Sequence, residues 1–111
     1  MLKRPADFAA IGAHGTGRSH PLMTARFRRT GLDVTRIGLA TGRNLGSAVT
    51  RNRTRRRIRE ALRVMAPSFQ QGWDVLIIAR PAIAAADHDA LVAALTQLLR
   101  RGGVLEGTVR S

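Results

Sequence analysis

The 111-residue sequence predicts a single α+β domain, a sandwich in which one mixed sheet of about four strands packs against helices. The length suits one compact domain, and 44% of the residues are hydrophobic, which is enough for a core. Residues 73–79 (WDVLIIA) form a nearly continuous apolar run that predicts a central strand buried on both faces. Long segments on either side of this run carry apolar residues at helical spacing. No repeat or low-complexity tract divides the chain.

The first third of the chain contains one predicted helix and one clearly predicted strand. A short helix is expected at residues 3–11. Pro5 is tolerated there because it falls in the first turn, where a backbone N–H would have no acceptor within the helix. Residues 14–21 (HGTGRSHP) are rich in chain breakers and predict a loop. A strand is expected at residues 22–27, and residues 18–25 leave room for one more short strand.

The middle of the chain predicts a hairpin followed by a long helix. Residues 28–33 contain a glycine and predict a hairpin turn, and residues 34–41 alternate like a half-buried strand. A loop is expected at residues 42–46. Ser47 then begins a helix that runs to about Met65, because its hydroxyl can accept an early amide hydrogen.

A second long helix is predicted after the central strand. Asp87 or Asp89 can begin it, and a core stripe at helical spacing follows at Leu91, Leu95 and Leu98. The glycine pair at 102–103 ends this helix. The sequence therefore predicts a domain over residues 1–103 and a flexible C-terminal tail over residues 104–111.

Positive charge is the outlying property of the composition. Nineteen Lys and Arg face seven Asp and Glu, which gives a formal net charge of +12, and Lys3 is the only lysine. A folded domain this cationic repels itself unless a polyanion is present. Arginine also offers a planar fork that binds phosphate through two hydrogen bonds. A nucleic-acid partner is therefore expected.

Several other classes of function are disfavoured. The chain has no cysteine, so disulfides and thiolate metal sites are excluded. No apolar run approaches a membrane span, and the N-terminus does not resemble a signal peptide, so a cytoplasmic protein without a membrane partner is expected. The histidines are scattered, no paired carboxylates are evident, and no small-molecule substrate is expected. Nothing in the chain supplies a nucleophile together with its base.

The densest signal lies in the predicted long helix, where seven arginines fall between Arg51 and Arg63. Its docking side on an ideal helix consists of Thr54, Ile58, Ala61, Leu62 and Met65. One exposed flank then carries Asn52, Arg55, Arg56, Arg59 and Arg63, and a second carries Arg53 and Arg57. Two or three basic residues would be an ordinary solvated face. Seven with one interleaved acid indicate a nucleic-acid-binding helix.

Residues 38–60 (GLATGRNLGSAVTRNRTRRRIRE) closely resemble the signature of the bacterial ribonuclease P protein component. That pattern has a Gly-Leu strand, a basic loop, Gly-x-Ala-Val and an Arg-Asn-Arg motif that opens a basic helix. Similar segments occur at residues 7–8, 14–15 and 74–81 and in the last helix, so the resemblance covers about residues 3–103. It implies the element order αβββαβα with a left-handed βαβ crossover.

The resemblance implies a subunit of a ribonucleoprotein nuclease that removes the 5′ leader of precursor tRNA. Catalysis would reside in the RNA subunit and would use Mg²⁺ held mainly by that RNA, with no catalytic residue in this chain. The chain would bind the catalytic RNA and the leader. By resemblance, Asn52 would lie near waters bound to Mg²⁺, with no direct metal ligand from the protein.

Residue roles follow from the same resemblance. The expected RNA-binding residues are Arg43, Arg51, Asn52, Arg53, Arg55, Arg56, Arg57, Arg59 and Arg63. The expected leader-binding cleft contains Phe8, Asn52, Arg55 and Arg59, although a lone Phe on a short helix is equally typical of a core residue. The chain departs from the family where a second aromatic residue is common, because Gly12 and either Met23 or Thr24 stand there. Asn44 stands where the family often has lysine.

Rival functions remain open on composition alone. A small ribosomal protein would be equally basic and equally devoid of catalytic groups, and only the contiguous signature separates the two. An RNA reader that stacks bases on its sheet needs two or three strand aromatics, and the strands here offer only Phe27 and Trp73. A helix-turn-helix regulator needs a second helix close before Ala48. A stand-alone nuclease lacks acidic metal ligands.

Overall fold

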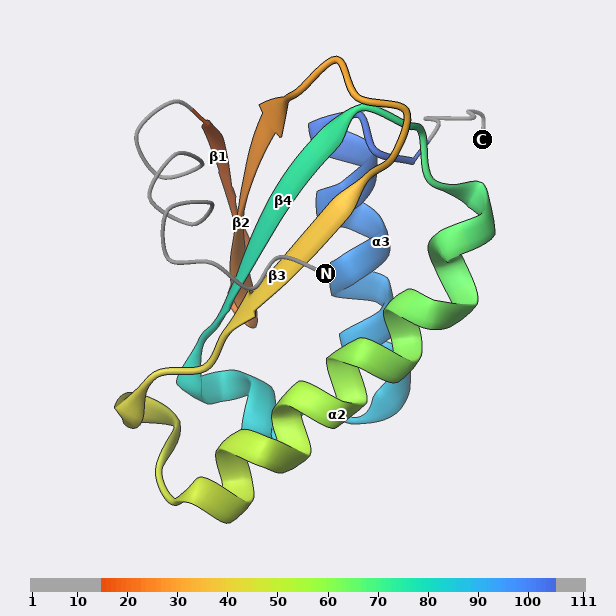
Figure 1. Cartoon of the computed structure of the whole chain (residues 1–111). Helices are drawn as coiled ribbons and strands as arrows, with labels where there is room; N and C mark the ends of the chain where they lie inside the picture. Colours follow the sequence, from red (N-terminus) through yellow and green to blue (C-terminus); the bar gives the residue numbers. More distant parts are fainter. Residues whose placement is uncertain (1–14, 106–111) are drawn as a thin grey trace.

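The computed structural model describes residues 15–105, which form one sheet with helices on one of its faces (Figure 1). The strands of this part are β1 (Thr16–Ser19), β2 (Met23–Arg29), β3 (Arg36–Ala40) and β4 (Trp73–Ala79). Its helices are α2 (Ala48–Met65) and α3 (His88–Gly102), with short 3-10 helices η1 (Arg43–Leu45), η2 (Ala66–Ser68) and η3 (Pro81–Ala85). The α+β class and the mixed four-stranded sheet are confirmed. The helix expected at residues 3–11 lies outside the described residues.

β4 is the central strand that organises the sheet, whose order is β1-β2-β4-β3. It pairs antiparallel with β2 and parallel with β3, so Val75 lies opposite both Phe27 and Ile37. The apolar run of β4 is thus buried, as predicted. The hairpin expected at residues 28–33 is wrong, because β4 separates β2 from β3. A turn-rich segment identifies a change of direction but not which strand will pair with which.

β1 occupies the middle of the segment predicted as a loop at residues 14–21, and it overlaps only in part the residues 18–25 where one more short strand was expected. All four of its residues are exposed, so the strand carries no alternating apolar pattern. It forms because Thr16 to Ser19 pair antiparallel with Phe27 to Thr24 of β2. The connecting turn is closed by hydrogen bonds between the backbones of His20 and Met23. Local composition could not reveal a strand defined by its neighbour.

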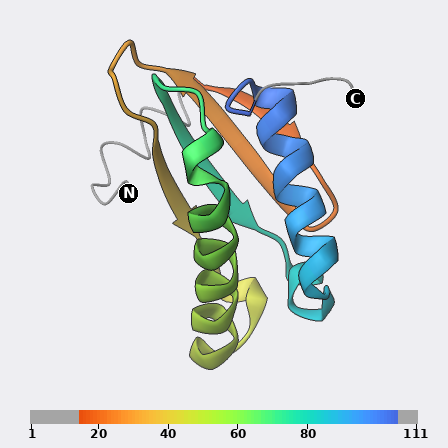
Figure 2. The same cartoon turned by 90° about the vertical axis from the view of Figure 1, so that its right-hand side faces the viewer.

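The connection from β3 through α2 to β4 is left-handed. With the helices toward the reader, β3 and β4 both run downward and β4 lies to the right of β3 (Figure 2). Nearly all parallel β-α-β connections have the opposite hand. The left-handed crossover that the family resemblance implied is therefore present.

The core lies between the sheet and the two long helices. α2 contributes the buried side chains Thr54, Ile58, Ala61 and Leu62, with Met65 half-buried, which confirms the predicted docking side. Asp87 caps the start of α3, because its carboxylate accepts a hydrogen bond from the amide of Ala90 at 2.8 Å. Its core stripe consists of Leu91, Ala94, Leu95, Leu98 and Leu99. Both helices therefore use the sides that their periodicity predicted.

The end of α3 lies close to the two sheet aromatics. Phe27 and Trp73 meet edge to face, with ring centroids 6.3 Å apart. Gly103 ends the helix at φ +93°, a left-handed conformation that suits glycine. The chain does not leave the core at that point, where the sequence suggested a tail from residue 104. Val104 is fully buried and Leu105 forms a bridge to Phe69, because the turn directs both back toward the core.

We expect Gly102→Ala to destabilise the fold. An added Cβ would lie 2.4 Å from the ring of Phe27, which is 2% exposed and cannot easily move aside. The expected loss is about 1–3 kcal/mol in the free energy of unfolding, with altered emission from Trp73. Urea denaturation followed by circular dichroism and fluorescence measures both.

Gly31→Ala is the control for Gly102→Ala. Gly31 has φ +76° and nothing within 4 Å of an added Cβ, so an alanine there should add only backbone strain of about 1 kcal/mol. Emission from Trp73 should stay unchanged in that variant. If Gly102→Ala matched wild type in both measurements, close contact between α3 and the aromatic pair would be disproved.

Candidate nucleic-acid interface

The N-terminus of α2 is suited to anions. Gly46, at φ +101°, leads into Ser47, whose hydroxyl oxygen accepts a hydrogen bond from the amide of Thr50 at 3.2 Å. No acidic residue occupies the first turn. The amides and dipole of a helix N-terminus favour negative charge, so arginines placed there cost stability in the free protein. Arg51 and Arg53 nevertheless lie within the first two turns, which fits a site built for phosphate.

Four arginines of α2 have no internal partner. Within residues 15–105, no hydrogen bond or ion pair engages the side chains of Arg51, Arg53, Arg56 or Arg59. Arg53, Arg56 and Arg59 are exposed, and Arg51 is half-buried. We call these four residues together with Asn52 the α2 surface. Their charges repel one another on a helix that is held rigidly against the sheet.

Asn52 and Arg55 connect the α2 surface to the end of β3. Arg55 is half-buried, and its guanidinium donates to the hydroxyl oxygen of Thr41 at 2.6 Å and to the Oδ1 atom of Asn52 at 3.3 Å. The side of α2 that carries Asn52, Arg55 and Arg59 therefore lies alongside β3. A cavity of about 270 Å³ lies between Arg59, Ile37 of β3 and the helix. Of the three cleft residues predicted on α2, only Arg59 lines this cavity, whereas Asn52 and Arg55 lie beside Thr41 at the end of β3.

Arg57 does not belong to the exposed flank that the helical pattern assigned to it. It is half-buried, and its guanidinium donates to the carbonyl oxygens of Ala86 at 2.6 Å and Ile83 at 3.4 Å. These carbonyls belong to η3 and to the residue that follows it, just before α3 begins. Arg57 therefore connects α2 to the start of α3. Helical periodicity cannot reveal this role, because its partners are remote in sequence.

Arg63 is paired within its own helix. Its guanidinium donates to the carboxylate of Glu60 at 2.8 Å, and both side chains are exposed. This hydrogen bond and the positive charge of Arg63 lower the pKa of the Glu60 carboxyl. The pair reduces the charge that Arg63 offers to a ligand. Of the remaining predicted residues, Phe8 and the side chain of Arg43 lie outside what the structure describes.

A row of charged side chains crosses the opposite face of the sheet. The strand register places Arg28, Asp74 and Arg36 side by side on β2, β4 and β3. Asp74 is 1% exposed and accepts two hydrogen bonds from Arg36, at 2.7 and 2.8 Å, with Arg28 at 3.8 Å. The sequence suggested no role for Asp74. The sequence did contain one indication of this role, because a carboxylate inside an apolar strand needs cationic partners, which neighbouring strands can supply.

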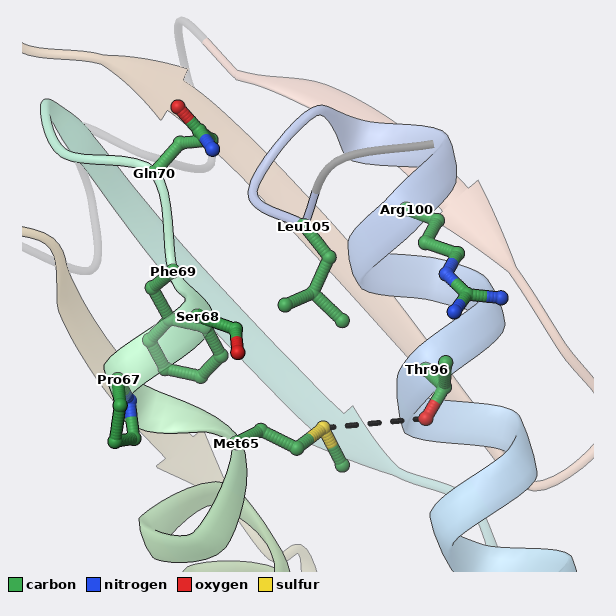
Figure 3. Close-up of a pocket in the computed structure, with 8 residues that line it drawn as sticks. All are labelled: Met65, Pro67, Ser68, Phe69, Gln70, Thr96, Arg100 and Leu105. Carbon is green, nitrogen blue, oxygen red and sulfur yellow. Dashed lines mark hydrogen bonds between the residues drawn. The ribbon is translucent and has the colours of Figure 1, made fainter. Parts of the chain in front are cut away.

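The described residues form no recognisable catalytic centre. A cavity of about 610 Å³ lies between the end of α2 and α3, and Met65, Phe69 and Leu105 point toward it (Figure 3). Ser68 and Thr96 line it with hydroxyl groups, that of Thr96 donates to the carbonyl oxygen of Val92 at 2.8 Å, and no His, Asp or Glu among the described residues lines the cavity as a base. Between residues 15 and 105, no group of three His, Cys, Asp or Glu could hold a metal ion. No helix in that stretch is long and apolar enough to span a membrane.

Comparison with known sequences identifies relatives along most of the chain. A family model described as Ribonuclease P matches residues 1–103. The ribonuclease P protein component of Chloroflexus aggregans is 40% identical over 105 residues, which cover 94% of this chain and 78% of the relative. The corresponding protein of Roseiflexus sp. is 47% identical over 76 residues, or 68% of this chain. That match spans 62% of the Roseiflexus protein, less than two thirds of its length.

Solved structures give the same result. The RNase P protein of Staphylococcus aureus superposes with a TM-score of 0.86 at 25% identity, covering 95% of this chain and 96% of its own. The RNase P protein from Thermotoga maritima gives 0.83 at 28% identity, covering 90% and 94%. Sequence and fold therefore agree, and the chain belongs to the ribonuclease P protein family.

Proposed function

We propose that this chain is the protein subunit of a ribonuclease P ribonucleoprotein. In this role it binds the catalytic RNA and the 5′ leader of precursor tRNA, and it promotes endonucleolytic removal of the leader. The observation that carries the proposal is a rigid helix with four unpartnered arginines, on a protein whose described residues hold no metal-binding or nucleophilic cluster. A family protein of this kind assists chemistry that its RNA partner performs.

RNA phosphates match the electrostatics of the α2 surface. Arg51 and Arg53 lie against the unfavourable end of the helix dipole, and each like-charged pair one turn apart costs a few tenths of a kcal/mol. Bound phosphates would reverse both costs and release counterions from the RNA. A planar arginine fork binds phosphate with two hydrogen bonds, which favours an ordered contact over a diffuse one.

The leader would lie along the groove between α2 and β3. Asn52 offers an amide to a base edge or sugar, and Arg59 stands at the mouth of the cavity beside Ile37. Arg55 holds the groove in shape through Thr41 while presenting part of its charge. These contacts are electrostatic and tolerant of sequence, as binding of many different leaders requires. A stacking contribution from Phe8 stays a prediction.

Mg²⁺ would be held by the RNA and not by the protein. Mg²⁺ prefers carboxylate, phosphate and water oxygens. The Oδ1 atom of Asn52 accepts from Arg55, and the single carboxylate of α2, Glu60, pairs with Arg63. The described side chains around Asn52 therefore do not fit a protein-bound Mg²⁺. Asn52 could still hydrogen-bond a water of an RNA-bound ion, so we keep Mg²⁺ as a cofactor of the assembled particle.

Reconstitution with the ribonuclease P RNA of the same organism tests the function directly. Cleavage of a precursor tRNA is followed at low Mg²⁺ with wild type, Arg51→Ala/Arg53→Ala and Arg51→Lys/Arg53→Lys. We expect strong stimulation by wild type and at least about a tenfold loss of kcat/KM in the alanine variant, since two charged contacts disappear. The lysine variant should lie between them because it keeps charge but loses the fork. Tight RNA binding by wild type without any stimulation would favour a ribosomal or general RNA-binding role instead.

Two neighbouring arginines provide a matched pair of opposite effects. Arg57→Ala removes two hydrogen bonds to backbone carbonyls, so we expect a loss of about 1–2 kcal/mol in the free energy of unfolding with nearly unchanged RNA affinity. Arg56→Ala removes the same charge from the α2 surface. It should leave stability nearly unchanged and lower the slope of log K against log salt by about 0.7–0.9. Chemical denaturation and RNA titrations at several salt concentrations measure both, and equal effects of the two variants on RNA affinity would contradict the assignment of Arg57.

A further inference from the structure

A second cationic pocket lies at the other end of the sheet from the start of α2. Its volume is about 190 Å³, and it is lined by Thr16, Arg18, Phe27, Trp73, Arg101 and Gly102. β4 begins at this end, beside the C-terminal end of α3, and runs toward the end where α2 begins (Figure 1). We call it the Trp73 pocket. The α2 surface and the Trp73 pocket are therefore separate features of one molecule.

Glycines at the end of α3 let the helix backbone pack directly against the aromatic rings that line the pocket. A Cβ on Gly102 would lie 2.4 Å from the ring of Phe27, and one on Gly103 would lie 3.1 Å from Cζ2 of Trp73. The helix can thus end close to both rings without placing side chains over them. Phe27 is buried, whereas Trp73 is only half-buried. The result is a small hollow with an aromatic face.

Three arginines from three different elements surround this hollow. Arg18 of β1 and Arg101 of α3 line it, and the guanidinium carbon of Arg29 lies 5.0 Å from the centroid of the Trp73 ring. All three are exposed, and no hydrogen bond or ion pair engages their side chains within residues 15–105. Among the residues that the structure describes, no carboxylate lines the pocket. Interaction with the helix dipole explains Arg101 but not Arg18 or Arg29, which belong to strands.

We propose that the Trp73 pocket binds one unpaired nucleotide of an RNA strand. Its phosphate would lie between the guanidinium groups of Arg18 and Arg101, and its base would contact the exposed part of Trp73. Single-stranded nucleic acids are bound by this combination of an aromatic platform and arginine charge. A pocket of this size admits one planar base but not a duplex. An acidic peptide would use the arginines and leave the indole without a partner.

This inference rests on the proposed RNA-binding function but adds a contact at a different place. An RNA held only by the α2 surface would leave the far end of the sheet free. With both sites occupied, the protein would contact two separate parts of the RNA and would hold them at a distance set by β4. The Trp73 pocket should therefore contribute to affinity independently of α2.

Trp73 is the only tryptophan in the chain, so its emission reports on this pocket alone. The full-length protein is titrated with a short labelled single-stranded RNA, and anisotropy of the label and emission of Trp73 are recorded together. We expect the emission to be quenched as the RNA saturates. Arg18→Gln/Arg101→Gln should lose the quench, weaken binding about tenfold, and lower the salt slope by about 0.7, the value for one phosphate contact with a single strand.

Arg53→Gln/Arg56→Gln is the matched control, since it removes the same charge from the α2 surface. It should weaken binding while saturating RNA still quenches Trp73. RNA binding by wild type without a Trp73 response, or an unchanged quench in Arg18→Gln/Arg101→Gln, would overturn the pocket but not the RNA-binding function. Absence of RNA binding by anisotropy would overturn both. Equal quenching by polyglutamate would show a general anion patch and reject the nucleotide site. Thermal unfolding of each variant verifies that the fold is retained.

Discussion

The packing of a narrow apolar stripe of α2 against the sheet is the contact on which the rest of the structure depends. Thr54, Ile58, Ala61 and Leu62 are almost fully buried on a helix that otherwise carries seven arginines and one acid. Each buried aliphatic side chain contributes about 1.5–3 kcal/mol, which offsets the repulsion among the cations. Without this docking the helix would be a flexible basic segment, and its arginines would have no fixed relation to β3.

Docking also divides the arginines of α2 by role. Those that face neighbouring elements become structural, as Arg57 does through the carbonyl oxygens of Ile83 and Ala86. Arg55 holds the end of β3 through Thr41. Arginines that point away from every protein element keep their hydrogen-bonding capacity for a ligand. A cluster that is uniform in sequence is therefore heterogeneous in function, and counting charges overstates the number of groups available to RNA.

The central strand connects the two ends of the molecule. β4 carries Trp73 at its start, Asp74 in a row with two arginines of the flanking strands, and an apolar run that holds both helices. Because it pairs with β2 on one side and β3 on the other, it sets the distance between the α2 surface and the Trp73 pocket. Rigid spacing of two small contacts suits a protein that orders a larger RNA, since neither contact alone needs to be strong.

Local periodicity in the sequence determined the long helices, their buried sides, the central strand and the basic character of α2. These features follow from interactions within a few residues, such as the Ser47 and Asp87 caps and the spacing of Ile58 and Leu62. Tertiary structure alone decided the placement of β4 between β2 and β3, the exposed strand β1, and the packing of Val104. It also decided the structural role of Arg57 and the meeting of Arg18 with Arg101 at Trp73. The physical reason is that strand pairing and side-chain partners remote in the chain depend on where other elements pack, which local sequence patterns do not record.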